Sequence, residues 1–139
     1  MNIRSFRVED TEQVVQLWMD CGLTRPWNNP RKDIERKLLV QPELFLVGES
    51  QGRIVASVMA GYEGHRGWVN YLAVSPALQT GGFGRQLMSD VETRLLALGC
   101  PKVNLQVREG NDQAMAFYRR LGYTEDRATG FGKRLIADD

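Results

Sequence analysis

The spacing of apolar positions changes along the chain between the period of a helix and the period of a strand. Phe83, Leu87, Val91 and Leu95 lie four apart, which predicts one face of an amphipathic helix. Apolar residues alternate between Lys102 and Val107, which predicts a strand. The full pattern predicts the order β-α-α-β-β-β-α-β-α-β, with strands over residues 2–7, 44–49, 53–62, 67–74, 102–107 and 131–136 and helices over 11–21, 30–40, 83–98 and 112–121.

Polar residues and glycines mark the ends of these elements. Asp10 with Gln13 predicts a capping box, and Asn29 before Pro30 predicts a second helix start. The strands from 44 to 74 predict an antiparallel meander, whereas strand–helix–strand from residue 67 to 107 predicts one parallel crossover. We therefore expect an α+β fold with a mixed, mostly antiparallel sheet flanked by helices, formed by residues 1–139 as one domain.

Composition removes several classes of function. The chain has 139 residues, 42% of them hydrophobic, with 18 basic against 17 acidic side chains and a net charge of +1. This balance does not favour nucleic-acid binding. The longest apolar run, Ile54 to Tyr62, is far shorter than the roughly 20 residues of a membrane span. With no signal peptide at the N-terminus, we expect a cytoplasmic protein, either monomer or homodimer, whose Cys21 and Cys100 are reduced thiols.

A glycine-rich segment, Gly81-Gly82-Phe83-Gly84, joins the predicted strand at 67–74 to the next helix. Free N–H groups at a helix start bind anions, so this segment predicts a cradle for a pyrophosphate. A P-loop would require Lys after the last glycine, but Arg85 stands there. A glycine-rich turn without a ligand remains an equal alternative on these residues alone. The single histidine, His65, lies between loop-like glycines, and no metal site is expected.

A second segment, residues 107–123, carries a resemblance to a known family. It reads Val-Arg-x-x-Asn-x-x-Ala-x-x-x-Tyr-x-x-Leu-Gly-Tyr, and Gln79 to Gly84 matches the pattern Arg/Gln-x-x-Gly-x-Gly/Ala. Together the two segments resemble the acetyl-CoA signature and the second motif of the GNAT N-acetyltransferase superfamily, in the form of its RimI-like branch. The resemblance covers nearly the whole chain.

The resemblance implies an acetyl-CoA site. The pantetheine arm would pair with the backbone of one strand, and the pyrophosphate would lie on the glycine-rich loop. The implied strand residues are Leu72, Ala73 and Val74, and the implied loop residues are Thr80, Gly81, Gly82, Phe83, Gly84 and Arg85. Asn111 is expected to reach the cofactor, to cap its helix, or both.

The resemblance also implies a general acid and leaves the general base open. Tyr118 would protonate the departing thiolate, because a phenol of pKa about 10 keeps its proton at neutral pH. The RimI-like branch has a glutamate before the Val-Arg pair, but this chain has Gln106, whose amide is not basic. Glu63 and Glu109 are the acidic candidates for that role.

These expectations favour an acetyl-CoA-dependent N-acetyltransferase that transfers the acetyl group directly to a primary amine in a ternary complex. The amine would belong to a small molecule, a peptide or a protein N-terminus, and Trp27 would either contact it or pack between the first two helices. Two alternatives remain. One is an acyl-CoA-binding regulatory module with little or no turnover, and the other is a structural domain with a vestigial cradle.

Overall fold

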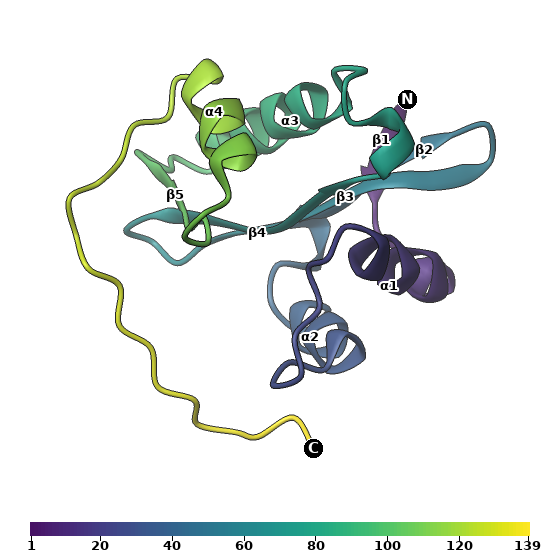
Figure 1. The fold of residues 1–139 in the computed structure, drawn as a ribbon, viewed down its shortest axis with the longest axis horizontal. Coiled ribbons are helices and arrows are strands. Elements are labelled where there is room, and N and C mark those ends of the chain that lie inside the picture. Colours follow the sequence, from purple (N-terminus) through teal and green to yellow (C-terminus); the bar gives the residue numbers. More distant parts are fainter.

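The fold is built on one five-stranded sheet with the strand order β1-β2-β3-β4-β5, described here from a computed structural model of residues 1–139 (Figure 1). The strands are β1 (Asn2–Ser5), β2 (Phe45–Ser50), β3 (Arg53–Tyr62), β4 (Gly67–Val74) and β5 (Val103–Leu105). The helices are α1 (Thr11–Asp20), α2 (Pro30–Lys37), α3 (Phe83–Ala97) and α4 (Asp112–Arg120). Strands β1 to β4 are antiparallel and β5 is parallel to β4, which confirms the α+β class, the meander and the crossover.

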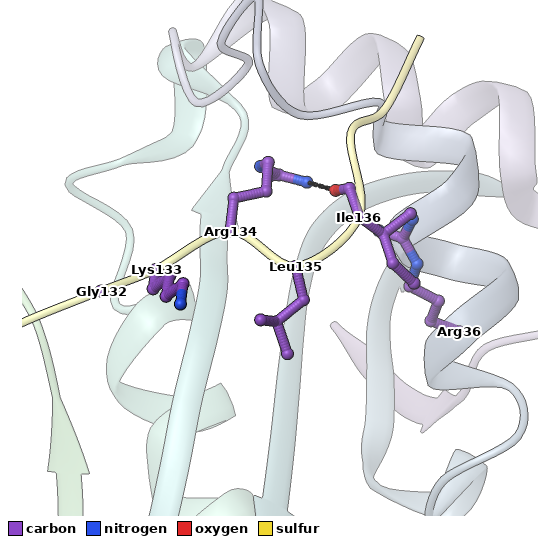
Figure 2. Close-up of a pocket in the computed structure, with 6 residues that line it drawn as sticks. All are labelled: Arg36, Gly132, Lys133, Arg134, Leu135 and Ile136. Carbon is purple, nitrogen blue, oxygen red and sulfur yellow. Dashed lines mark hydrogen bonds between the residues drawn. The ribbon is translucent and has the colours of Figure 1, made fainter.

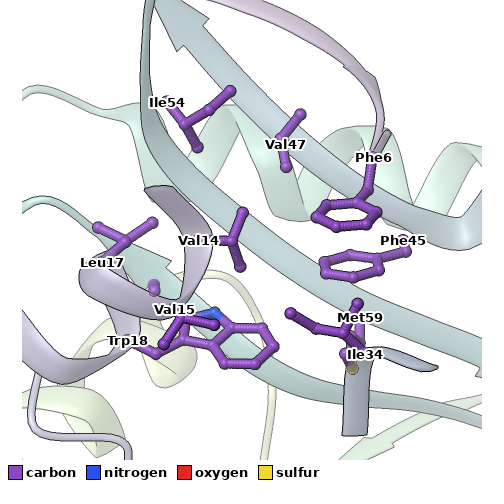
Figure 3. Packing of buried hydrophobic residues seen from close by; sticks show 11 residues of the cluster. Phe6, Val14, Val15, Leu17, Trp18, Ile34, Phe45, Val47, Ile54 and Met59 are labelled. Carbon is purple, nitrogen blue, oxygen red and sulfur yellow. The ribbon is translucent and has the colours of Figure 1, made fainter. Parts of the chain in front are cut away.

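Helices cover both faces of the sheet, with α1 and α2 on one face and α3 and α4 on the other (Figure 1). Side chains alternate along a strand, so β2 sends Phe45 and Val47 into the core under α1, and Leu46 into the core under α3. Figure 3 shows the first core, where the rings of Phe6 and Phe45 stack at 4.2 Å between centroids. No helix has both the length and the apolar character needed to cross a membrane.

Two predicted helix boundaries differ from the structure. Asp10 precedes α1 but does not cap it. Its buried carboxylate instead accepts hydrogen bonds from the guanidinium of Arg4, at 2.7 and 2.9 Å, and from the N–H of Arg7. Helix α2 is capped by Asn29 as predicted, but it ends at Lys37 rather than Val40. Helical geometry is disfavoured for the residue before a proline, and Gln41 before Pro42 takes a left-handed backbone instead.

The strand predicted over residues 131–136 is not formed. No strand follows α4, and the tail instead leaves the sheet and runs to α2 (Figure 1). Phe131 is 96% exposed and Leu135 is 85% exposed, so the alternating apolar residues that suggested a strand bury almost nothing. The tail is held near its end by polar contacts, because the Asp138 carboxylate accepts from Arg36 at 2.6 Å and from the Asn29 N–H at 2.8 Å.

Candidate active site between β4 and β5

The candidate site begins where β4 and β5 separate. The two strands pair only from Gly67↔Val103 to Val69↔Leu105, and β5, which is shorter than predicted, ends there. Strand β4 continues to Val74 while paired on its other side with β3. The second half of β4 therefore has a free backbone edge facing the gap beyond β5.

A bulge in β4 lies at the point of separation. Ser57 pairs with Ala73 and Met59 pairs with Asn70, so Tyr71 and Leu72 both lie opposite the single residue between Ser57 and Met59. Tyr71 has a left-handed backbone, with φ of 54°. A bulge of this kind bends a strand, and this one lies just beyond the last pair of β4 and β5, Val69↔Leu105.

Successive residues of a strand direct their backbone N–H and C=O groups alternately to its two sides, which determines which residues of β4 face the free edge. The Ser75 N–H donates to the Val55 carbonyl, so Ser75 and Ala73 turn their polar groups toward β3. Leu72 and Val74 consequently point theirs toward the open side. The Val74 carbonyl is already reached there by the Gln79 amide at 3.1 Å and the Cys21 thiol at 3.2 Å. The strand geometry thus turns Leu72 and Val74, but not Ala73, toward the side where an extended ligand would pair, and such a ligand would have to replace these two donors to reach the Val74 carbonyl.

The glycine-rich loop delivers the N-terminus of α3 beside this edge. Gly82 is the N-cap residue, with φ of 81° and no capping side chain, and the first turn of α3 contains no acidic residue. The first N–H groups of the helix therefore lack a capping acceptor and carry the positive end of the helix dipole. Thr80, Gly81 and Arg85 are exposed around them. This is suitable chemistry for binding phosphate groups.

The two glycines of the loop serve different physical purposes. A Cβ on Gly82 would meet no atom within 4 Å, so that side of the loop is open to a ligand. A Cβ on Gly84 would lie 3.1 Å from the ring of Phe117, on α4. Gly84 is buried, and its missing side chain allows α4 to pack against the start of α3. The expected part of Gly84 in binding the pyrophosphate stays a prediction.

Helix α4 places Tyr118 on the core side of the site. Its ring packs edge-on against Phe117 and Tyr123 and joins the same core cluster as Leu72 and Val74. Burial raises the pKa of the Tyr118 phenol to about 12. Every fully buried side-chain oxygen or nitrogen has a hydrogen-bond partner, so the Tyr118 hydroxyl is not buried and unpaired. Asn111 caps α4, and its side-chain oxygen accepts from the Ala114 N–H at 3.1 Å.

Comparison with known families agrees with this geometry. The model of the acetyltransferase (GNAT) family matches residues 11–123, which is most of the chain. The chain belongs to the GNAT acetyltransferase family. A Yersinia pestis protein named acetyltransferase is 51% identical over 138 residues, covering 99% of this chain and 98% of its own. The predicted family and enzyme class, an acyltransferase, are thereby confirmed.

Solved structures share the GNAT fold. The Escherichia coli ribosomal-protein-S18-alanine N-acetyltransferase superposes with a TM-score of 0.74 at 22% identity, covering 90% of this chain and 78% of that one. AAC(6')-Iy in complex with the bisubstrate analog CoA-S-monomethyl-acetylneamine superposes with a TM-score of 0.78 at 18% identity, covering 96% and 97%. At these identities the likeness establishes the fold, and the assignment to the RimI-like branch stays a prediction.

The acidic candidates for the GNAT general base occupy different places. Glu63 lies in the turn before β4, beyond the paired ends of β4 and β5. Its carboxylate accepts from the N–H groups of His65, at 2.6 Å, and Arg66, and these bonds lower its pKa. Glu109 is exposed in the loop between β5 and α4, which borders the gap. Gln106, directly after β5, is exposed.

Sequence reasoning missed two contacts around the site. The Tyr71 hydroxyl donates to the Asp33 carboxylate at 2.7 Å, joining β4 to α2. The guanidinium of Arg108 lies over the Trp27 ring, 5.8 Å from its centroid, and joins the α1–α2 loop to the loop after β5. Each contact joins residues far apart in the sequence, and no local pattern predicts either pair. The Arg108 contact shows that Trp27 lies beside the second GNAT motif rather than between the helices.

A separate hollow lies between the tail and α2 (Figure 2). It is lined by Arg36, Gly132, Lys133, Arg134, Leu135 and Ile136. None of the predicted site residues lines it. Its tail side is shaped by a local contact in which the Arg134 guanidinium donates to the Ile136 carbonyl at 2.8 Å. This hollow therefore lies apart from the candidate site described above.

Proposed function

We propose that the protein is an acetyl-CoA-dependent N-acetyltransferase that transfers the acetyl group directly to a primary amine. The observation that carries the proposal is the free edge of β4 beside the uncapped N-terminus of α3. A GNAT neighbour solved with a CoA-linked bisubstrate analog, and another named for an alanine acceptor, agree with an acyl-CoA donor and an amine acceptor. The acyl donor would supply a thioester whose carbonyl is open to attack by the amine.

The residues of the site divide the work of binding. The first N–H groups of α3, from Phe83 to Arg85, would bind the pyrophosphate, with Thr80 and Gly81 beside it. The open side of Gly82 lets the backbone approach a phosphate without obstruction. The backbone groups of Leu72 and Val74 would pair with the extended pantetheine arm and orient the thioester. Asn111, already a helix cap, would face the same ligand from α4.

Two groups would handle protons. Tyr118 holds its proton at neutral pH and can donate a hydrogen bond to the sulfur as negative charge develops on it. The amine requires a proton acceptor, and Glu109 is the better candidate because it borders the gap and the contacts of Glu63 lower the basicity of that carboxylate. Glu109 would act through a water molecule. Attack of the amine on the carbonyl carbon forms the N–C bond, and the amine proton passes through the water to Glu109. Cleavage of the C–S bond releases the thiolate, which accepts the hydrogen bond from Tyr118 and then takes a proton from solvent.

One observation favours a second candidate function. Gln106 stands where the RimI-like branch has a glutamate, and an amide cannot accept the amine proton. An acyl-CoA-binding regulatory module would keep the cradle without turnover. A panel of amines with acetyl-CoA, followed by detection of free thiol, separates the two: binding with no thiol release for any amine would favour the regulatory module.

The cradle itself is tested by matched glycine substitutions. We expect Gly82→Asn to weaken acetyl-CoA binding at least tenfold in calorimetry, because its side chain would project into open space meant for the ligand. Asn tolerates the left-handed backbone, so the helix start should survive. Gly99→Asn is the control, because Gly99 has a similar φ of 84° with nothing within 4 Å of a Cβ at the other end of α3. Equal affinity for both variants and the wild type would reject the cradle.

A further inference from the structure

We propose that Tyr71 and Asp33 are positioning residues whose hydrogen bond holds the β4 bulge, and with it the backbone edge that binds acetyl-CoA. This inference rests on the proposed function and adds residues that lie outside both sequence motifs. Neither residue needs to touch the ligand. Their effect would be transmitted through Leu72, the next residue of β4.

The bulge needs support because its backbone conformation is unfavourable for a large side chain. Three non-glycine residues have a positive φ, and Gln41 and Gln51 lie in a loop and a hairpin turn. Tyr71 alone has this conformation inside a strand. Such a conformation persists only where surrounding contacts fix it. It also costs the pairing of β4 with β5, which ends two residues earlier at Val69.

Three contacts fix Tyr71 from three directions. Its ring stacks on the Trp18 indole, with 3.9 Å between centroids and 9° between planes. Its carbonyl accepts a long hydrogen bond, 3.4 Å, from the Ser57 hydroxyl, which in turn accepts from the Trp18 indole N–H at 2.8 Å. Its hydroxyl donates to the Asp33 carboxylate at 2.7 Å. Trp18 and Ser57 are completely buried, so the first two contacts are part of the core.

Of the three contacts, only the hydrogen bond to Asp33 lies outside the core, and we assign the positioning role to it. It joins the bulge to α2, a helix outside the sheet. Burial and the adjacent carboxylate both raise the pKa of Tyr71, so its hydroxyl remains a donor over the whole working range of pH. A donor and an ionised acceptor at this distance make a strong hydrogen bond. Removing either partner should release the ring and let the Leu72 edge sample positions that pair less well with the arm.

Three substitutions and one double variant test this pair. We expect Tyr71→Phe and Asp33→Ala each to raise the Kd for acetyl-CoA about threefold to tenfold, the range expected for losing one hydrogen bond. The double variant should have a Kd no higher than that of the weaker-binding single variant, because each single substitution already removes the hydrogen bond between Tyr71 and Asp33. Asp33→Asn should bind more tightly than Asp33→Ala and less tightly than the wild type, since its amide oxygen still accepts from the Tyr71 hydroxyl but carries no charge.

Tyr62→Phe is the matched control. The Tyr62 hydroxyl also donates to a neighbouring group, the Gly64 carbonyl at 3.1 Å, but it lies in the turn region away from the gap. Urea unfolding should show similar, small losses of stability for Tyr62→Phe and Tyr71→Phe, while calorimetry should show a changed Kd for Tyr71→Phe alone. A purely structural role would lower stability without this difference in binding.

The outcomes separate this inference from the proposed function. A wild-type chain that does not bind acetyl-CoA would overturn both. A wild-type chain that binds, with an unchanged Kd for Tyr71→Phe and Asp33→Ala, would overturn the positioning role alone. If Tyr71→Phe fails to fold, the pair Asp33→Ala and Asp33→Asn decides: equal binding by these two variants would reject the hydrogen bond as the positioning contact.

Discussion

Replacing Tyr118 with Phe removes one hydroxyl from the site and leaves the ring packing in place. The structure sets the size of the expected effect. A phenol with a pKa of about 12 is a much weaker acid than a thiol of pKa about 8.5, so full proton transfer to the thiolate would be unfavourable by about 3.5 units, or roughly 5 kcal/mol. Donation of a hydrogen bond to the developing thiolate carries no such cost. A bond of that type is worth about 1.5–3 kcal/mol. We therefore expect kcat to fall about tenfold to a hundredfold, which reaches only the lower limit of the roughly 10²–10⁴-fold that general acids contribute.

The raised pKa also predicts the pH dependence of this contribution. A phenol with an ordinary pKa of 10 would be half ionised at pH 10, whereas one with a pKa of about 12 would be about 1% ionised there. The Tyr118 phenol thus keeps its proton at least up to pH 10. The ratio of wild-type to Tyr118→Phe rates should stay constant from neutral pH to pH 10.

The assay follows loss of the thioester absorbance with a saturating amine, under conditions where chemistry limits turnover. Tyr123→Phe is the control, because this neighbouring ring packs against Tyr118 but its hydroxyl donates to Glu92 at 2.6 Å. Tyr123→Phe should change the rate little. Tyr118→Phe should also unfold in urea close to the wild type, since no hydrogen bond within the protein is lost. Equal rates for Tyr118→Phe and the wild type would mean that Tyr118 serves only in core packing. A ratio of wild-type to variant rates that falls toward one near pH 10 would refute the raised pKa.

Two further substitutions test other parts of the structure. Asp10→Asn should lower the free energy of unfolding by about 2–3 kcal/mol, because it weakens the pair with Arg4. The pKa of Asp10 is lowered on folding, so its contribution to the free energy of unfolding is present above its unfolded pKa and is lost as the pH falls below about 4. Urea unfolding across that range should show that the stability of Asp10→Asn depends less on pH than that of the wild type. Gln106→Glu should raise the rate below the pKa of the acceptor amine and lose its advantage above it. Superimposable pH–rate profiles for Gln106→Glu and the wild type would mean that a carboxylate at position 106 does not assist the reaction.

Local signals in the sequence predict most of the sheet and helices correctly. Asn29 accepts from the N–H groups of Arg31 and Lys32, as a helix cap before Pro30 should. The four-residue spacing from Phe83 to Leu95 forms the inner face of α3, and Leu87, Val91 and Leu95 are almost completely buried there. These features depend on residues within one or two turns of each other, which is the range over which periodicity and capping operate.

The tail shows where local pattern fails. The alternation of Phe131, Lys133 and Leu135 is compatible with a strand, but a strand forms only with a partner and a face to bury. In the structure the end of the tail is held by cationic donors: the Arg36 guanidinium donates to the Asp138 carboxylate, and the Lys32 ammonium donates to the Asp139 carbonyl. Alternation specifies a possible strand, and the choice between the sheet and α2 depends on partners a hundred residues away.

The glycine loop and the bulge show why the site is only partly predictable. The motif places glycine at positions 82 and 84, but it does not distinguish a glycine that leaves room for a ligand from one that leaves room for Phe117. That distinction depends on where α4 packs. The bulge at Tyr71 depends equally on long-range partners, since its hydrogen bond to Asp33 spans 38 residues. The motifs therefore identify the segments expected to bind acetyl-CoA, whereas the backbone geometry of those segments also depends on long-range contacts such as Tyr71 with Asp33. A substitution at Asp33 is then expected to alter acetyl-CoA binding while both motifs remain intact.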